Sequence, residues 1–293
     1  MVGSPGSGKT LLSRRIPTIL PDLTFTEALE ITKIHSVAGL IESSNIIKER
    51  PFRNPHHTIT KTALIGGGKT PEPGEISLAH FGVLFLDEFP EFSKQTIEVL
   101  RGPLEDKKVT ISRVNGSYTY PSNFMLVASM NPCPCGYFGS QIKKCTCTDK
   151  QRFKYLSKIS GPILDRIDIQ VQVPNVKYEN FREKSAENSD EIRARVNKAR
   201  NIQLERYKGL DIYSNSELTP KMIEKVCKLN EASKVVLKKS FENLKLSARA
   251  YYKILKIART IADLDGSKDI ETIHVIEAIG YRSLDKINGN NRN

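Results

Sequence analysis

The chain has 293 residues, 39% of them hydrophobic and 27% charged, which is typical of an ordinary globular protein large enough for two domains. No apolar run is long enough to cross a bilayer, and Met1 leads into a polar, glycine-rich stretch instead of a signal sequence, so we expect a cytoplasmic protein without a membrane partner. The formal net charge of +12 indicates either a polyanionic partner or a solvated, lysine-rich surface.

The first ten residues contain the pattern G-x-x-x-x-G-K-[ST], which is typical of a phosphate-binding loop that runs into a helix. Its members are Gly3, Ser4, Pro5, Gly6, Ser7, Gly8, Lys9 and Thr10. The glycines let successive backbone N–H groups turn toward the β- and γ-phosphates, Lys9 adds a positive charge, and the Thr10 hydroxyl can bind Mg²⁺. The pattern therefore predicts a site for ATP and Mg²⁺, with a chance glycine-rich turn as the alternative.

The next segment is expected to hold a helix and then a long loop. Apolar spacing predicts an amphipathic helix over Phe25–His35, with Thr24 as its N-cap. Farther on, Leu64–Lys69 sets three successive glycines beside two apolar residues, which indicates either a loop that contacts a substrate or a disordered connector. His56 and His57 precede this loop and are expected to support it, because no third metal ligand is evident.

Two apolar strands are predicted to end on polar side chains. Val83–Leu86 is typical of a strand buried in a parallel sheet, and Asp87 and Glu88 follow it, as in a Walker B element. Asp87 is predicted to hold Mg²⁺ through water, and Glu88 to act as general base on the attacking water. The strand Phe124–Met130 ends at Asn131, where a nucleotide sensor would lie; a local turn made by the asparagine side chain is the alternative.

A helix and a hairpin are expected between those strands. The helix is predicted over Phe92–Leu104, and the alternation of Val109–Tyr120 predicts a β-hairpin with Asn115 and Gly116 as its turn.

Four of the five cysteines form two C-x-C pairs separated by nine residues, and they are Cys133, Cys135, Cys145 and Cys147. In a cytoplasmic protein such a cluster indicates metal binding before disulfides. Two facing pairs can supply four thiolates to one tetrahedral ion, so we expect a structural Zn²⁺, with reduced free thiols as the alternative.

The composition changes after the last predicted strand. Ser160–Asp168 indicates a capped helix that leads into a strand over Ile169–Val173, and Pro174 ends this strand. We therefore expect an α/β domain over residues 1–176 and an all-helical domain over residues 177–293. The helices of the second domain are predicted over Asp190–Tyr207, Pro220–Leu229, Ala232–Leu244, Ala248–Leu264 and Ile270–Arg282. The tail after Asp285 is expected to fray.

The order of these elements resembles an AAA+ ATPase and, more narrowly, the magnesium-chelatase-like branch that includes the bacterial ComM/YifB proteins. The matching segments are Gly3–Thr10, Phe52–His57, Ala63–Gly68, Pro73–His80, Leu84–Glu88, Met130–Gly136, Ser160–Asp168, Ser247–Ala250 and Ala258–Leu264. The resemblance covers nearly the whole chain, and the cysteine-bearing segment makes it specific. It implies an α/β fold, namely a P-loop AAA+ core with a parallel sheet flanked by helices, followed by an all-helical C-terminal lid domain.

The resemblance also implies roles for single residues. Asn131 would be sensor 1, Arg249 the sensor 2 arginine that contacts the γ-phosphate from the lid, and Arg166 the finger inserted into a neighbouring subunit's site. An arginine donated in trans makes hydrolysis depend on oligomerisation, so a homo-hexameric ring is implied. The glycine-rich loop and the hairpin would line its pore and grip DNA.

Two functions follow from the resemblance. One is an ATP-hydrolysing motor and DNA helicase that promotes branch migration during recombination of incoming DNA, with accessory recombination proteins as partners. The other is a chelatase-type motor subunit that remodels a protein partner to insert Mg²⁺ into a porphyrin. The cysteine cluster and the net charge of +12 favour the first. A scaffold without turnover would lack the base or the finger, whereas both Glu88 and Arg166 are present.

The start of the chain carries a further expectation. Only Met1 and Val2 precede Gly3, whereas a phosphate-binding loop ordinarily follows a buried strand of about five residues. In AAA+ proteins this strand lies between the strand that ends at Asn131 and the last core strand, so its absence would leave unpaired backbone groups, at about 1–3 kcal/mol each. We therefore expect a fragment, or a reading frame begun too late, that binds ATP poorly and aggregates; a soluble, fully active product would contradict this.

Overall fold

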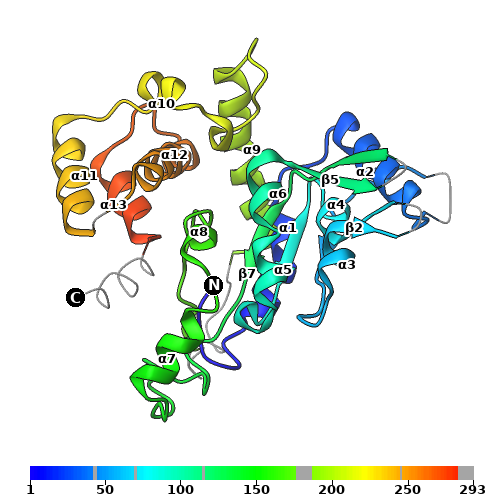
Figure 1. The fold of residues 1–293 in the computed structure, drawn as a ribbon. Coiled ribbons are helices and arrows are strands. Elements are labelled where there is room, and N and C mark those ends of the chain that lie inside the picture. Colours follow the sequence, from blue (N-terminus) through cyan, green and yellow to red (C-terminus); the bar gives the residue numbers. More distant parts are fainter. Residues whose placement is uncertain (42–44, 69–70, 114–115, 176–186, 245, 283–293) are drawn as a thin grey trace. The chain divides into compact units, whose positions relative to one another are not determined.

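The structure is a computed structural model that describes residues 1–41, 45–68, 71–113, 116–175, 187–244 and 246–282 (Figure 1). It divides into an N-terminal unit, Met1–Ile167 with Gln172–Ala186, and a C-terminal unit, Asp168–Val171 with Glu187–Asn293. The predicted domain boundary at residues 176 and 177 and the predicted frayed tail lie outside the described residues. No described helix has the length and apolarity needed to cross a membrane.

The N-terminal unit is built on a parallel sheet with the strand order β1–β4–β7. The strands are β1 (Phe52–Arg53), β4 (Val83–Leu86) and β7 (Met125–Ala128). The central strand β4 is fully buried and pairs with both neighbours, so its continuous apolar sequence is the one that a strand covered on both faces requires. This confirms the predicted α/β class and the parallel sheet.

Val2 lies beside the segment that follows β7. It forms parallel bridges with Met130 and with Gln172, so it occupies the place that the sequence predicts for a first strand. The Met1 ammonium donates a hydrogen bond of 2.7 Å to the Ala128 carbonyl, and its burial lowers the pKa of this group to about 6. The strand predicted over 169–173 is reduced to isolated bridges, because among the described residues Gln170 pairs only with Arg282 and Gln172 only with Val2.

Helices flank the sheet. Helix α1 (Lys9–Ile19) directs Ile16, along with Leu20 just beyond it, onto a core formed by side chains of β4 and β7. Helix α2 (Phe25–Val37) begins with the predicted N-cap, because the Thr24 side chain accepts from the Glu27 N–H. The other helices of this unit are α3 (Lys61–Ile65), α4 (Glu75–Leu78), η1 (Phe89–Glu91), α5 (Lys94–Glu98), α6 (Arg101–Asp106), α7 (Asp149–Leu156) and α8 (Gly161–Leu164).

The single helix predicted over 92–104 is wrong in its extent, since two short helices, α5 and α6, occupy this segment. The physical reason is Pro103, which has no N–H to donate to the carbonyl four residues earlier.

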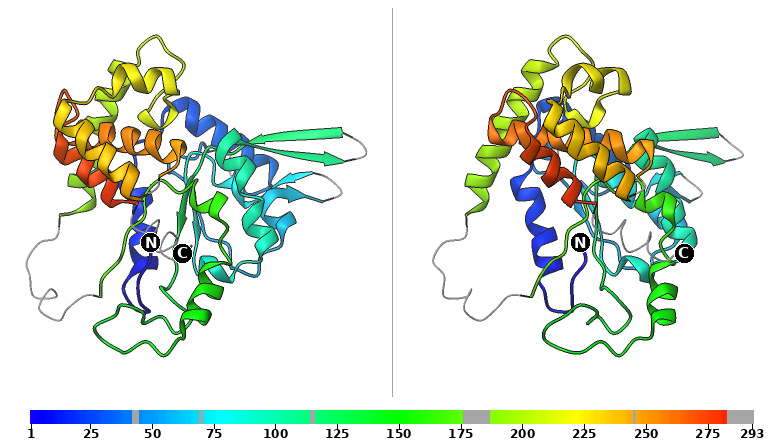
Figure 2. Two further views of the ribbon diagram at one scale, coloured as in Figure 1. Left: turned by 60° about the vertical axis from the view of Figure 1, so that its left-hand side comes forward. Right: turned by 90° about the vertical axis from the view of Figure 1, so that its left-hand side faces the viewer.

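Two antiparallel hairpins extend from the same side of the N-terminal unit (Figure 2). One consists of β2 (Gly66–Gly67) and β3 (Glu72–Pro73), and the other of β5 (Lys108–Arg113) and β6 (Gly116–Pro121). The second confirms the predicted hairpin, although its turn residue Asn115 lies outside the described residues. The predicted glycine-rich loop is instead α3 followed by β2, and Lys69 is not among the described residues. The hairpins contact one another, since the Tyr120 hydroxyl donates a 2.7 Å hydrogen bond to the Pro71 carbonyl.

The regular elements among the described residues of the C-terminal unit from 187 onward are helices, as predicted. The elements are α9 (Ser189–Arg206), η3 (Asn215–Glu217), α10 (Pro220–Val226), α11 (Glu231–Leu244), α12 (Ala248–Asp265) and α13 (Thr272–Gly280). Helix α12 is capped by the Ser247 hydroxyl, which accepts from the Ala250 N–H. Its buried face, including Ile254 and Ala258, packs in one apolar cluster with Val275 of α13.

A buried polar network crosses this helical core. The carboxylate of Asp263 accepts hydrogen bonds from both terminal nitrogens of Arg206, from Arg259 Nε at 3.1 Å and from Asn215 Nδ2 at 2.8 Å. Burial opposes ionisation of Asp263, but the hydrogen bonds from Arg206 and Asn215 outweigh it and hold the carboxyl pKa below its ordinary value. The network therefore ties α9, η3 and α12 together.

Removal of this carboxylate should destabilise the helical unit. In Asp263→Ala, Arg259, whose side chain is 3% exposed, would keep a buried charge without its partner, so we expect a loss of about 3–5 kcal/mol. The measurement is the free energy of opening of the α12 amides by native-state hydrogen exchange. Lys234→Ala removes an exposed pair with Glu231 and is the control, expected to change little. Equal effects of the two substitutions would contradict a stabilising role for the network.

Candidate functional site

The loop of residues 3–8 connects Val2 to the first turn of α1. Gly6 and Gly8 have φ angles of +77° and +84°, a left-handed conformation that only glycine adopts at little cost. A side chain at Gly3 would lie 2.6 Å from the Val173 carbonyl oxygen. Because α1 begins at Lys9, the unpaired N–H groups of its first turn face this loop, which is the arrangement that binds phosphate.

Lys9 folds back over the loop. Its ammonium donates to the carbonyls of Gly3 at 2.8 Å and Ser4 at 2.9 Å, and lies 3.3 Å from the Asn131 amide oxygen. Burial lowers the pKa of Lys9, while the negative charge of Asp87 acts in the opposite direction. The structure thus brings the predicted lysine and the predicted sensor asparagine into direct contact.

Asp87 is held between two hydroxyl groups. Thr10 Oγ1 donates to one carboxylate oxygen at 2.7 Å, and Ser129 Oγ donates to the other. The Glu88 N–H also donates to Asp87, at 3.0 Å. A hydroxyl and a carboxylate in contact are hard oxygen ligands of the kind that Mg²⁺ takes together with phosphate oxygens. The sequence analysis did not assign a role to Ser129. The only signal in the sequence is that a polar residue follows the apolar segment of the predicted strand.

Glu88 stands apart from this cluster. Its backbone has a φ of +52°, a strained conformation for a residue with a side chain, and its carboxylate is 59% exposed. His57 Nδ1 lies 3.5 Å from Glu88 Oε2, and the His56 ring packs against the His57 ring at a tilt of 36°, with centroids 4.1 Å apart. The sequence placed these histidines near a loop, but not beside Glu88.

The two predicted arginines come from different units of the chain. Arg166 pairs with Glu105 at 2.8 Å and donates to the Pro162 carbonyl at 2.7 Å, and its side chain is 11% exposed. Its Nε is buried and has no hydrogen-bond partner among the described residues. Arg249 lies exposed in the first turn of α12, in the C-terminal unit.

The four clustered cysteines converge as predicted, with all their sulfur atoms within 4.8 Å of one another. Cys133 Sγ lies 3.4 Å from Cys135 Sγ and 3.7 Å from Cys145 Sγ. Four sulfurs placed tetrahedrally at about 2.3 Å from one Zn²⁺ would be about 3.8 Å apart, so the set fits such an ion.

The backbone around Cys135 favours the thiolate form of this residue, whereas the pKa values of the Cys133 and Cys147 thiols are raised, that of Cys133 chiefly by burial. The N–H of Cys135 donates to Cys147 Sγ at 3.3 Å, and backbone hydrogen bonds from Tyr137 and Thr146 hold the pKa of the Cys135 thiol below its ordinary value. Among the described residues, this is the sole group of three or more such side chains close enough to share a metal ion.

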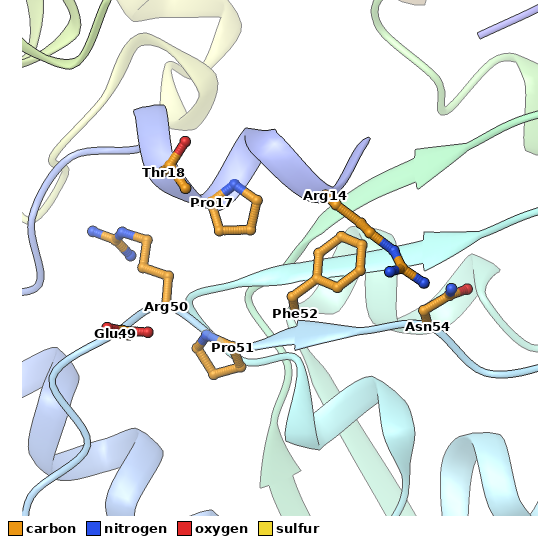
Figure 3. A pocket seen from close by; sticks show the side chains of 8 residues that line it. All are labelled: Arg14, Pro17, Thr18, Glu49, Arg50, Pro51, Phe52 and Asn54. Atoms are coloured by element: carbon orange, nitrogen blue, oxygen red, sulfur yellow. The ribbon is translucent and has the colours of Figure 1, made fainter. Parts of the chain in front are cut away.

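A shallow cavity of about 760 Å³ lies elsewhere, between α1 and the segment around β1 (Figure 3). Its lining residues are Arg14, Pro17, Thr18, Glu49, Arg50, Pro51, Phe52 and Asn54. The Arg50 guanidinium is already bonded to the Pro21 carbonyl at 2.6 Å and to the Phe81 carbonyl at 2.7 Å. None of the predicted site residues lines this cavity, so we do not assign the nucleotide to it.

The sequence matches two protein-family models and several known proteins. Residues 1–181 match the family described as magnesium chelatase, subunit ChlI, and residues 186–282 match the family of its C-terminal part. The chain is 43% identical over 285 residues to Competence protein ComM of Haemophilus influenzae, covering 97% of this chain and 55% of ComM. It is 42% identical over 290 residues to the uncharacterized protein YifB of Escherichia coli, covering 98% of this chain and 56% of YifB.

A more distant relative is magnesium-chelatase subunit ChlI of Euglena gracilis, 24% identical over 154 residues, which cover 45% of this chain and 44% of that protein. The chain spans about half the length of these two relatives, because the match covers 55% of ComM and 56% of YifB.

Proposed function

This chain belongs to the magnesium chelatase ChlI family of AAA+ proteins, and from that premise we propose that it is an ATP-hydrolysing motor that acts on DNA. The observation that carries the proposal is the convergence of Lys9, Thr10, Asp87 and Asn131 at one end of the parallel sheet, with Glu88 at its rim. These side chains supply a cation, two oxygen ligands, an amide and a base, which are the groups that phosphoryl transfer to water requires.

In the proposed reaction, the loop amides and Lys9 bind the β- and γ-phosphates. Thr10 and Asp87, which now bond to each other at 2.7 Å, would turn their oxygens toward Mg²⁺. When bound, the ion neutralises charge that develops on the phosphate oxygens. Glu88 accepts a proton from the water whose oxygen attacks the γ-phosphorus, while the bond to the β-phosphate oxygen breaks and ADP leaves. Asn131 orients the γ-phosphate or this water.

The proposal includes assembly of several copies of this chain into a ring. Arg166 bonds to Glu105 and Pro162 within its own chain, so a finger role requires it to exchange Glu105 for a γ-phosphate on a neighbouring subunit. Arg249, exposed on α12, would reach the phosphate from the lid domain. We propose a homo-hexamer, located in the cytoplasm.

DNA is the proposed substrate because three features favour it over a porphyrin-related protein partner. The identity to ComM is 43% over nearly the whole chain, whereas that to the Euglena chelatase subunit is 24% over less than half of it. The net charge is +12. The hairpin β5–β6 also carries basic residues, including Lys108 and Arg113, on a projecting element. Chelatase-type remodelling of a protein remains the alternative, and helicase activity is part of the DNA proposal.

Zinc is the proposed occupant of the cysteine cluster. Its four thiolates would saturate a tetrahedral ion and leave no open position, so a bound Zn²⁺ would be structural. This separates the cluster from the chemistry at Glu88.

The proposed activity is tested by ATP turnover of the chain with and without branched duplex DNA. We expect DNA to stimulate turnover, and the stimulation to fall steeply with added salt, because phosphate contacts release counterions. Glu88→Gln should keep nucleotide affinity, since Thr10 and Asp87 are unchanged, and lose about 10²–10⁴ in turnover.

Full turnover in Glu88→Gln would remove this residue from the role of base. Turnover that responds to no DNA but to a protein partner would favour the chelatase-type alternative instead.

The trans role of Arg166 is tested in mixed assemblies. Arg166→Ala should bind nucleotide and fail to hydrolyse it, because the transition-state charge loses its cation. Mixing with Lys9→Ala subunits, which still carry Arg166, should partly restore turnover. Arg101→Ala, which removes an exposed arginine paired with Glu98, is the control. If mixing restores nothing, the arginine acts in cis or not at all.

Zinc is expected at one equivalent per chain by elemental analysis of protein purified under reducing conditions. The double substitution Cys133→Ser with Cys145→Ser should release it, because it removes two of the four ligands. Cys227→Ser is the matched control, since this cysteine is buried in the apolar core of the C-terminal unit and is not one of the four converging cysteines. Metal-free wild-type protein would exclude a zinc site.

A further inference from the structure

A glycine next to the cysteine cluster lies against the phosphate-binding loop. Gly136 follows Cys135 directly and has a φ of +85°, and its N–H donates a 3.0 Å hydrogen bond to the Cys133 carbonyl. A methyl group added at Gly136 would lie 2.6 Å from Pro5 Cδ and 2.7 Å from Pro5 Cγ. The turn of residues 133–136, which holds the first two cysteines, therefore packs against the loop through a contact at Gly136 that leaves no room for a side chain.

Asn131 lies just before this turn. Cys133 is two residues beyond Asn131 and is completely buried. Tyr155 of α7, 8% exposed, lies within hydrogen-bonding reach of the Asn131 backbone. Asn131 in turn lies against Lys9, at 3.3 Å. The segment from Asn131 to Gly136 thus forms one wall of the nucleotide site.

The cysteines connect that wall to a second segment. Cys145 and Cys147 come from ten residues farther on, and Thr148 immediately caps α7. Arg152 of α7 donates to the Cys147 carbonyl at 3.1 Å and lies 4.2 Å over the Phe138 ring. An ion held by all four sulfurs would therefore join the wall, the intervening loop and α7 into one stiff element.

We propose that the metal-loaded cysteine cluster is a positioning element of the nucleotide site, which holds the phosphate-binding loop in place through the contact of Gly136 with Pro5. The inference rests on the zinc and nucleotide binding proposed above. It gives the cluster a role in nucleotide affinity, although no cysteine takes part in the reaction.

The chain offers a matched pair of variants. Gly136 and Gly139 lie in the same loop, and both have a left-handed φ, +85° and +74°. A methyl group at Gly139 would meet no atom within 4 Å, whereas one at Gly136 would meet Pro5. Gly136→Ala and Gly139→Ala therefore share the backbone strain and differ in the contact.

The experiment measures three quantities in the full chain: zinc content, hydrogen exchange of residues 3–9, and the dissociation constant of Mg·ADP. In Gly136→Ala we expect retained zinc, and about tenfold faster loop exchange and about tenfold weaker nucleotide binding, since overpacking displaces the loop. Gly139→Ala should match the wild type in loop exchange and affinity. Exchange in α12 should be unchanged in both, which separates a local effect from general destabilisation.

Removal of zinc from wild-type protein by a chelator should likewise speed exchange of residues 3–9. Unchanged loop exchange after zinc removal would overturn the inference, and so would equal loop exchange in the two glycine variants. Wild-type protein purified without metal, yet with a slowly exchanging loop, would also overturn it. If wild-type protein fails to bind nucleotide, the proposed function is wrong, while loop exchange still decides this inference.

Discussion

The hydrogen bond between Thr10 and Asp87 joins the two sequence motifs on which the candidate site depends. Thr10 belongs to the first turn of α1, and Asp87 follows the fully buried strand β4, so the bond exists only because α1 packs on the core beside that strand. The carboxylate would be costly to hold there alone, and the hydroxyls of Thr10 and Ser129 satisfy it from opposite sides. The apolar packing of α1 thus sets the geometry of a polar site.

The parallel arrangement explains why the remaining groups meet at the same edge. Strands β4 and β7 run in one direction, and Val2 bridges to Met130 in that direction as well. Their carboxyl ends therefore deliver Asp87, Asn131 and the loop of residues 3–8 to one place, as the general rule for open α/β sheets requires. Lys9 then reaches both the loop carbonyls and Asn131, and its lowered pKa follows from the burial that this convergence creates.

The sequence predicted those parts of the site that depend on local pattern. The loop glycines, the strand before Asp87, the hairpin and the cysteine pairs each have a recognisable spacing, and the cysteines do converge. Ser129 and the pairing of His57 with Glu88 could not be predicted, because each depends on two strands lying side by side. The predicted helix over 92–104 was too long for a local reason, the proline at position 103. The predicted strand over 169–173 was too long because its residues pair only through isolated bridges.

The contacts that hold Arg166 leave part of its guanidinium group without a hydrogen-bond partner among the described residues. Its two terminal nitrogens are bonded to Glu105 and Pro162, but its Nε is buried with no partner among the described residues, which costs about 1–3 kcal/mol. Glu105 itself is 41% exposed, so water can solvate this carboxylate if the arginine leaves. Both features lower the free-energy cost of replacing Glu105 and the Pro162 carbonyl by a phosphate, which could accept hydrogen bonds from the whole guanidinium group. In the proposed finger role, the ion pair with Glu105 would hold Arg166 only until a phosphate replaces this carboxylate.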